Sequence, residues 1–271
     1  AEWIAAFLDK EPESRKEKAI NIARSFGFKV KPMNINNSGT SWNILGDGVT
    51  LVQPLTSIKG LGEKAVEQII NNRPFNTVEE FLFDENISYS KLNKRAVDVL
   101  VRSQALNCLK DERFTGLKHF WSAVAVDRPR KLKNLEENIA KYAPEGDFSE
   151  EEKIEFLAAL TGVFPMSMVV GEQLMQKFEE KYISPISEYD PDLGIVWFVP
   201  RKVEPRKTKN GKTYWIVDTI DSTSKLTKIR CWGIREQDRI FINRPYMARL
   251  NYNDQWGFST SSVYHNFKLV G

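Results

Sequence analysis

The sequence predicts an α+β protein of several domains: a mostly helical N-terminal part with a helix-hairpin-helix motif, then a C-terminal all-β barrel of the OB-fold type. The chain has 271 residues, which at about 100–200 residues per domain indicates two or three domains. Apolar residues recur at helical spacing through residues 171–182, and short β-rich runs replace them after Pro191. Several short strands in close succession are typical of a small barrel or sandwich.

The expected elements follow from this spacing and from residues that end helices. Ser149 is expected to cap a helix whose first turn is acidic, and Gly162 and Pro165 are expected to end it. The predicted helices lie at 2–9, 14–26, 54–72, 91–105, 150–160 and 171–182, with helical patches at 114–124 and 132–142. The predicted strands lie at 28–30, in a hairpin within 42–51, and at 195–203, 213–220, 225–232, 245–250 and 256–269.

Composition excludes several classes of protein. Hydrophobic residues make up 41% of the chain and charged residues 28%, as in ordinary globular domains and unlike collagen or disordered chains. No apolar run approaches the roughly 18–20 residues of a membrane span, so no membrane partner is expected. The start lacks the features of a signal peptide and an initiator Met, which indicates a piece of a longer protein. Cys108 and Cys231 give no disulfide framework and favour the reducing cytoplasm.

The net charge of +3 conceals a gradient along the chain. Residues 1–108 hold 14 basic and 13 acidic side chains, residues 109–194 hold 11 and 17, and residues 195–271 hold 14 and 6. A basic C-terminal third of this kind points to a polyanionic partner such as nucleic acid. It is equally consistent with a basic solvated surface, so charge alone does not decide.

The sharpest local signal is a helix-hairpin-helix pattern over residues 55–70. Gly60 and Gly62 allow a tight hairpin and a close approach of a phosphodiester to the backbone, and Leu61 is expected to pack inward. A helix starting at Gly62 would present free amides and its positive dipole end to a phosphate. Lys59 and Lys64 add charge, and Ala65 lets the helices pack closely. Such a contact positions a duplex without reading its sequence. The alternative is a glycine-containing turn between ordinary helices.

A second, degenerate copy of the motif is predicted over residues 90–101. It lacks both glycines, but Lys91, Lys94 and Arg95 could still face the DNA backbone. A basic solvated helix start explains this segment equally well.

The segment 201–212 joins two predicted strands through the hairpin turn Asn210-Gly211. A barrel with a basic loop between its first two strands is what an OB-fold would look like, and that fold binds oligonucleotides through one face and its loops. The candidate DNA-binding residues of the loop are Arg206, Lys207, Lys209 and Lys212.

Aromatic residues are frequent in the same part of the chain, and bases of single strands stack on such rings. About half of them must fill the barrel core. Tyr214 and Trp215 point to opposite faces of a strand, so one of the two is a surface candidate.

Signs of a metal or catalytic site are absent. His119 and His265 lack metal-ligand spacing to either cysteine, and no P-loop or nucleophile elbow occurs. Asp218 and Asp221 are interpreted as a strand end and a turn. No cofactor or metal is therefore expected in this chain, and no catalytic residue.

The order of these parts resembles the C-terminal region of the bacterial or phage DNA polymerase III alpha subunit, of the family C polymerases. Residues 58–66, Ile-Lys-Gly-Leu-Gly-Glu-Lys-Ala-Val, are close to the family's I-K-G-V-G-E-K-A-V. Further similar segments are 1–8 at the end of the fingers, 27–38, 92–95, 105–109, and 194–232 with the hairpin 207–212. The resemblance implies four parts: a fingers-like end at 1–50, a helix-hairpin-helix domain at 51–110, a helical connection at 111–190 and an OB-fold at 191–271.

The resemblance also implies a function. The parent protein would be a DNA-directed DNA polymerase whose palm carries the catalytic aspartates that bind two Mg²⁺. Palm and thumb would lie before residue 1, so this chain is expected to be inactive by itself and to grip duplex and single-stranded DNA. The sliding clamp or other replisome subunits are further partners that the resemblance suggests.

The chain departs from the family pattern over residues 152–165, where the family's His is missing. A recognisable clamp-binding pentapeptide before it is also missing. Residues 173–178 have some clamp-motif character but fit an amphipathic helix better. Two other functions stay open: a stand-alone nucleic-acid-binding accessory protein, and a protein-interaction module of a replisome.

Overall fold

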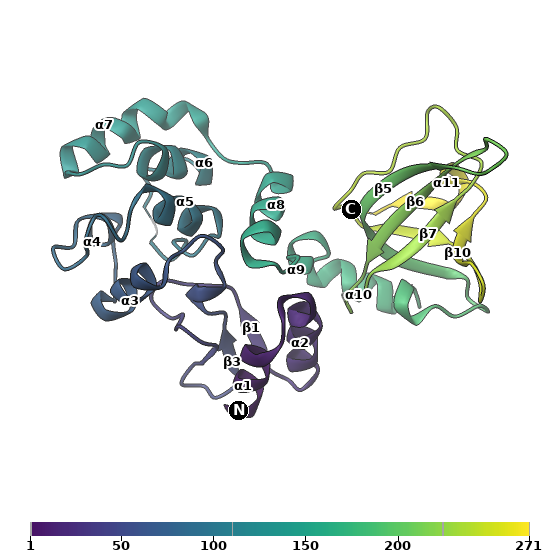
Figure 1. Cartoon of the computed structure of the whole chain (residues 1–271), viewed down its shortest axis with the longest axis horizontal. Coiled ribbons are helices and arrows are strands. Elements are labelled where there is room, and N and C mark those ends of the chain that lie inside the picture. Colours follow the sequence, from purple (N-terminus) through teal and green to yellow (C-terminus); the bar gives the residue numbers. More distant parts are fainter. Residues whose placement is uncertain (1, 110, 224, 271) are drawn as a thin grey trace. The chain divides into compact units, whose positions relative to one another are not determined.

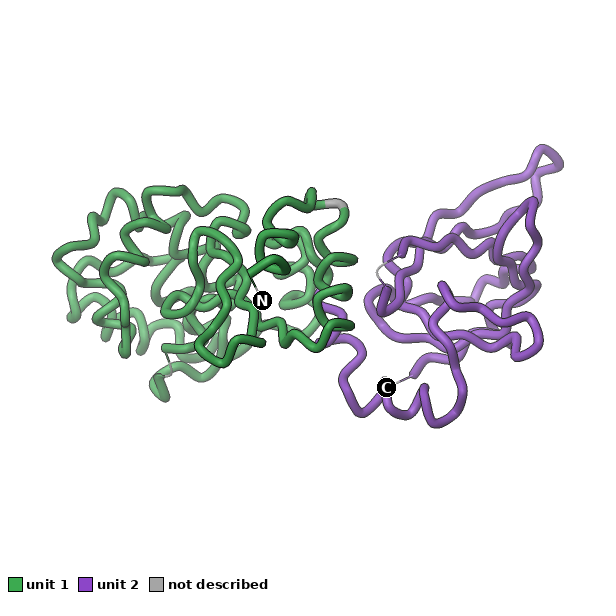
Figure 2. The backbone as a smooth tube through the Cα atoms, turned by 90° about the horizontal axis from the view of Figure 1, so that it is seen from below, with its two compact units in different colours: residues 1–164 green, residues 165–271 purple. Residues whose placement is uncertain are grey.

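The computed structural model describes residues 2–109, 111–223 and 225–270. The chain packs as two compact units, residues 1–164 and residues 165–271 (Figure 2). The predicted domain limits at residues 1, 110 and 271 fall outside the described residues. The four-part division stays a prediction.

The first unit is mostly helical (Figure 1). Its α8 (Glu150–Thr161) starts with the predicted cap at Ser149, extended to a full capping box with Glu152, and ends at Gly162 with φ of 70°. The other elements are α1 (Glu2–Lys10), α2 (Glu13–Ser25), η1 (Leu55–Ser57), α3 (Glu63–Asn72), α4 (Val78–Phe83), α5 (Lys94–Arg102), α6 (Leu117–Trp121), the π-helical turn η2 (Ser122–Val126), α7 (Leu132–Tyr142) and η3 (Ala143–Glu145).

A small sheet and two cores organise this unit. Strand β3 (Thr50–Val52) lies between β1 (Lys29–Lys31), which is parallel to it, and β2 (Asn43–Ile44), which is antiparallel. The α1–α2 pair and this sheet bury Ile4, Leu8 and Leu51. A larger core unites the helices from η1 to α8 and buries, among others, Leu55, Leu61, Val66, Leu92, Val97 and Leu135.

The second unit is a curled sheet consistent with an OB-fold (Figure 1). Strands β5, β6 and β7 form an antiparallel meander, β10 continues it parallel to β7, and β8 pairs with the other edge of β5. Strand β9 pairs with β10, and only Leu250 separates β9 from β8 in the chain. The two sides of the sheet are therefore joined, and the sheet curls toward a barrel. The elements are α9 (Met166–Val169), α10 (Glu172–Glu180), β4 (Ser184–Pro185), η4 (Ile186–Glu188), β5 (Ile195–Lys207), β6 (Thr213–Ile220), β7 (Thr227–Cys231), β8 (Tyr246–Arg249), β9 (Asn251–Asn253), β10 (Gly257–Thr260), α11 (Val263–Asn266) and β11 (Phe267–Leu269).

Several element boundaries differ from those expected. The predicted strand at 256–269 is two strands separated by α11, because the Ser262 side chain caps a helical turn. The first strand of the barrel is longer than expected and bends at an irregularity between Pro200 and Lys202. Among the helices of the described residues, none has the length and apolar content that crossing a membrane requires.

Candidate nucleic-acid interface

The predicted hairpin forms at residues 58–62. Gly60 has φ of 89°, in the left-handed region that favours glycine, and Leu61 is buried in the core as expected. Helix α3 begins at Glu63 with Gly62 as its N-cap. The first helix of the motif is reduced to the single 3₁₀ turn η1, so the helix expected over 54–72 is interrupted. The chain extends after Ile58, which lets the Lys59 amide donate to the carbonyl of Leu160 (2.8 Å).

The start of α5 lies beside this hairpin. A Cβ atom added at Gly60 would sit 3.5 Å from the guanidinium of Arg95 and from Val99, both on α5. The N-termini of α3 and α5 therefore meet in one open groove of about 550 Å³, lined by Gly60, Gly62, Glu63, Lys64, Ala65, Ser90, Lys91, Asn93, Arg95 and Ala96. Both helices have eight or more residues. The positive ends of their two dipoles thus face the same groove.

The two helix starts differ in how their amides are satisfied. At α5 the Asn93 side chain accepts from the Ala96 amide (3.0 Å), so the cap is occupied. At α3, Gly62 provides no side-chain cap. Within the described residues the amides of Glu63 and Lys64 have no protein acceptor, which leaves two backbone donors for a ligand oxygen.

The predicted DNA-binding residues of the two motif copies differ in whether they line the groove. Gly60, Gly62 and Lys64 line the groove together with Lys91 and Arg95 of the predicted second copy. Lys59 does not line it. Its ammonium lies 2.5 Å from the Glu13 carboxylate, a contact between distant parts of the sequence. Lys94 is exposed on the first turn of α5 and does not line the groove either.

The predicted basic loop of the barrel is shorter than expected. Arg206 and Lys207 belong to β5, where they pair with Tyr214 and Thr213 of β6. Lys209 and Lys212 are exposed in the turn, which Gly211 closes with φ of 76°.

The carboxylate of Glu204 lies among these cations. Arg206 pairs with it at 2.6 Å, and Lys202 contacts it as well. The hydrogen bonds from Lys202 and Arg206 lower the pKa of Glu204 to about 2. Arg206 is therefore partly neutralised, whereas Lys207, Lys209 and Lys212 form no ion pair within the described part of the chain.

The aromatic residues divide between the barrel core and its outside. Trp215 packs against the core, whereas Tyr214 stacks on Trp232 with ring centroids 4.5 Å apart and planes inclined by 23°. Trp197 and Phe198 are fully buried. Tyr214 is thus the surface member of the predicted pair. The alternation along β6 predicts that Tyr214 and Trp215 lie on opposite faces of the sheet. That Tyr214 stacks on Trp232 follows only from the pairing of β6 with β7.

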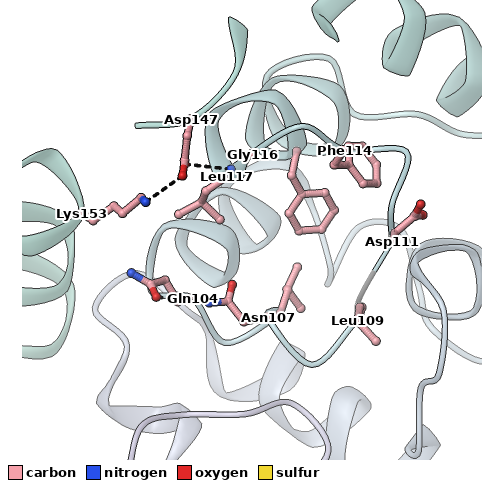
Figure 3. Close-up of a pocket in the computed structure, with 11 residues that line it drawn as sticks. Gln104, Asn107, Leu109, Asp111, Phe114, Gly116, Leu117, Asp147 and Lys153 are labelled. Atoms are coloured by element: carbon pink, nitrogen blue, oxygen red, sulfur yellow. Dashed lines mark hydrogen bonds and ion pairs between the residues drawn. The ribbon is translucent and has the colours of Figure 1, made fainter. Parts of the chain in front are cut away.

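A second hollow, of about 330 Å³, lies elsewhere in the first unit (Figure 3). Leu106, Leu117 and Phe120 contribute apolar walls, and the pair Lys153–Asp147 (2.7 Å) lies at its edge. Gln104 also lines it and has φ of 62°, unusual for a residue with a side chain. No residue predicted to bind DNA lies in this hollow.

The buried Asp221 and His119 side chains have hydrogen-bond partners in the fold. The buried carboxylate of Asp221 accepts from the Ser187 and Thr223 amides (both 2.8 Å) and supports a turn. His119 accepts at Nδ1 from the Thr115 amide, so its Nε2 donates to the Ile139 carbonyl (2.8 Å). Within the described residues no group of three or more His, Cys, Asp or Glu side chains is placed to hold a metal ion.

The segment 173–178 lies within α10, as its amphipathic pattern predicts. Phe178 is buried, and its ring stacks on Trp197 at 5.2 Å with planes inclined by only 10°. The aromatic residue of this segment is therefore packed in the interior of the second unit.

The hairpin and the helical core around it define a helix-hairpin-helix domain. A family model described as "Helix-hairpin-helix motif" matches residues 27–116. The matched region therefore includes the whole hairpin, α3, α4 and α5, whereas α6, α7 and α8, which pack into the same core, lie after it.

The relatives identify the kind of protein that carries this domain. The chain is 25% identical over 250 residues to the DNA polymerase III subunit alpha of Aquifex aeolicus, which covers 89% of this chain and 21% of that protein. It is 31% identical over 145 residues to the same subunit of Pseudomonas aeruginosa, covering 51% and 12%. It is 25% identical over 253 residues to an error-prone DNA polymerase of Corynebacterium glutamicum, covering 89% and 22%.

These matches confirm the resemblance predicted from sequence. The chain is homologous to DNA polymerase III alpha subunits over most of its length, in the region that carries their helix-hairpin-helix domain. It spans between a tenth and a quarter of the length of these relatives.

Proposed function

We propose that this chain is a DNA-holding part of a replicative DNA polymerase. The groove between α3 and α5 grips phosphates of the product duplex, and the basic outer face of the barrel holds single-stranded or template DNA. The parent protein is a DNA-directed DNA polymerase, and this chain alone carries out no synthesis.

The observation that carries the proposal is the meeting of two helix N-termini and three cations in one groove. Lys64, Lys91 and Arg95 are exposed and, within the described residues, form no ion pair with a carboxylate. The uncapped amides of α3 add donors with a fixed direction. Phosphate oxygens match both features, because helix ends favour anions and phosphates accept several hydrogen bonds.

Fluorescence anisotropy with labelled duplex, primer-template and single-stranded DNA tests the groove at several salt concentrations. A Lys64→Ala/Lys91→Ala/Arg95→Ala variant should weaken duplex binding and reduce the dependence of log K on log salt by about 2–3. Lys10→Ala, an exposed lysine on α1, is the control for loss of positive charge. Duplex binding that is unchanged in the triple variant contradicts the grip.

The barrel is tested separately with Lys207→Ala/Lys209→Ala/Lys212→Ala. This variant should weaken binding of single-stranded DNA more than binding of duplex DNA, because the groove is intact. If the unmodified chain binds no DNA even at low salt, the chain is a protein-interaction module, and pull-downs with clamp and clamp loader identify its partner. The length of the encoding gene separates a polymerase part from a stand-alone accessory protein.

A further inference from the structure

Three residues outside the predicted motifs form an aromatic and basic cluster next to the groove. The guanidinium carbon of Arg128 lies 4.3 Å from the centroid of the Tyr89 ring, and that of Arg130 lies 4.9 Å from the same centroid. Tyr89 immediately precedes Ser90 and Lys91, which line the groove. Arg128 also donates to the carbonyl of Leu92, which lies between the lining residues Lys91 and Asn93, so the cluster adjoins the groove without lining it.

The cluster is held in place by the fold. Arg128 donates from Nε to the carbonyl of Leu92 (3.0 Å), which connects it to the loop before α5. On the other side, the buried Asn138 side chain donates to the carbonyl of Asp127 (2.5 Å). Arg128 is half-buried, and this burial lowers the pKa of its guanidinium. These contacts hold Arg128 and the backbone of the loop in a fixed position, which reduces the entropy lost when a ligand binds.

The charges of the cluster have no carboxylate partner in the described part of the chain. Within the described residues neither Arg128 nor Arg130 forms an ion pair with a carboxylate. The nearby Asp127 pairs with Lys141 (3.0 Å) instead. Arg130 is exposed, so its free donors point to solvent or to a ligand. Two guanidinium groups over one ring repel each other within a Debye length, about 8 Å at physiological salt. An anion between or beside them relieves this repulsion.

We propose that Tyr89, Arg128 and Arg130 form a second seat for a phosphodiester of the same duplex, adjoining the groove between α3 and α5. This inference rests on the proposed function, and adds to it a seat that the hairpin motif does not contain. Arg128 supports the ring and the loop, and Arg130 donates to the phosphate. Arginine suits this position because its planar guanidinium can stack on the ring and, at the same time, donate hydrogen bonds to phosphate oxygens.

The test measures duplex binding of the 271-residue chain by anisotropy over a salt series. Arg130→Ala should weaken binding about 3- to 10-fold at low salt and reduce the salt slope by about 1, the value for one lost phosphate contact. Arg130→Lys should keep the slope, because the charge remains, but lose part of the affinity with the stacking. Lys10→Ala is the control, and thermal unfolding confirms that each variant folds.

The outcomes separate this inference from the proposed function. If Lys64→Ala/Lys91→Ala/Arg95→Ala weakens duplex binding but Arg130→Ala behaves like Lys10→Ala, the second seat is wrong and the groove stands. If the triple variant also binds normally, the proposed function itself is wrong. If Arg130→Ala weakens only single-stranded DNA of the same length, the cluster does not contact the duplex, and the assignment is overturned.

Discussion

The ammonium nitrogen of Lys59 lies 2.5 Å from Oε1 of Glu13, so the first lysine of the hairpin is paired across the unit and does not face the groove. Both side chains are about half exposed, and such surface pairs contribute only about 0–1 kcal/mol to stability. We expect Glu13 also to weaken duplex binding in the proposed groove, because it neutralises a cation beside it.

The pair predicts opposite effects for its two members. Glu13→Gln should strengthen duplex binding about two-fold at low salt, since it removes a negative charge and releases Lys59. The gain should disappear at high salt. Lys59→Ala should weaken binding less than Lys64→Ala does, and anisotropy measures both. A loss for Lys59→Ala as large as that for Lys64→Ala would mean that Lys59 leaves Glu13 to contact a phosphate.

The uncapped start of α3 predicts that stability and binding can be separated at Gly62. A Cβ atom there meets nothing within 4 Å, and the backbone is already extended (φ −75°, ψ 146°), as an N-cap requires. In Gly62→Ser, the hydroxyl should accept from an amide of the first turn and stabilise the chain by a few tenths of a kcal/mol. The same hydrogen bond removes a donor from the phosphate, so duplex binding should fall about 10-fold.

Gly62→Ala is the matched control for this change, because it adds the Cβ atom without an acceptor. Urea unfolding reports the stability of both variants, and anisotropy reports their binding. Equal losses of binding in the Ser and Ala variants would show that bulk, and not the occupied amide, excludes the phosphate.

We predict that replacing Gln104 with glycine stabilises the chain. It follows the last turn of α5 with φ of 62°, where the Ala105 amide donates to the Leu100 carbonyl (3.1 Å), the pattern of a helix C-terminus that usually carries glycine. Gln104→Gly should raise the free energy of unfolding by about 1 kcal/mol, because the left-handed conformation costs glycine nothing. Urea unfolding should show a higher midpoint with the same slope. Gln104→Ala keeps the strain and should give no gain.

The sequence predicted those parts of the structure that depend on local chemistry. The tight hairpin at Gly60, the cap at Ser149 and the turn at Gly211 are requirements of single positions, and each was recognisable from its residue type and neighbours. The α+β order with a helix-hairpin-helix and a barrel was predicted from periodicity, because helical spacing gives way to short β-rich runs after Pro191.

The parts that the sequence could not predict depend on contacts between distant residues. Glu13 and Lys59 are 46 positions apart, and no spacing rule connects them. The seat at Tyr89 combines a loop before α5 with a loop before α7. The alternation along β6 shows that Tyr214 and Trp215 face opposite sides of the sheet. Only the packing of Trp215 against the core shows that Tyr214 is the residue on the outer face. The whole set of predicted DNA contacts stays a prediction.

The two thiols predict a pH-dependent difference in reactivity. Burial raises the pKa of Cys231 to about 12, and it raises that of the half-buried Cys108 as well. At pH 8 Cys231 should therefore react with a thiol reagent only after unfolding, because the thiolate is the reactive form. The stability from the neutral Cys231 is fully present below the unfolded pKa of about 8.5 and is lost as pH rises toward 12. Labelling of Cys108→Ser with and without denaturant isolates Cys231, and rapid labelling of the native form would contradict its burial.

The stacked pair Tyr214 and Trp232 predicts how the barrel distinguishes single strands from duplex. The two rings lie on the outer face, and Arg206 pairs directly with Tyr214 on the neighbouring strand. An unpaired base can stack on this surface, which a base inside a duplex cannot do. Trp232→Ala should weaken binding of single-stranded DNA about 5- to 160-fold, the effect of about 1–3 kcal/mol per stacked base. Duplex binding through the groove should be unchanged.

Tyr264→Ala is the control for this prediction, since Tyr264 is an exposed aromatic residue of the same unit, on α11. Anisotropy with single-stranded and duplex DNA of equal length measures all three proteins. Because stacking involves no charge, the salt slope of Trp232→Ala should match that of the unmodified chain, whereas neutralising Lys207, Lys209 and Lys212 should lower it. A lowered slope in Trp232→Ala, or an equal loss for duplex, would mean that the rings support the basic hairpin and do not stack on bases.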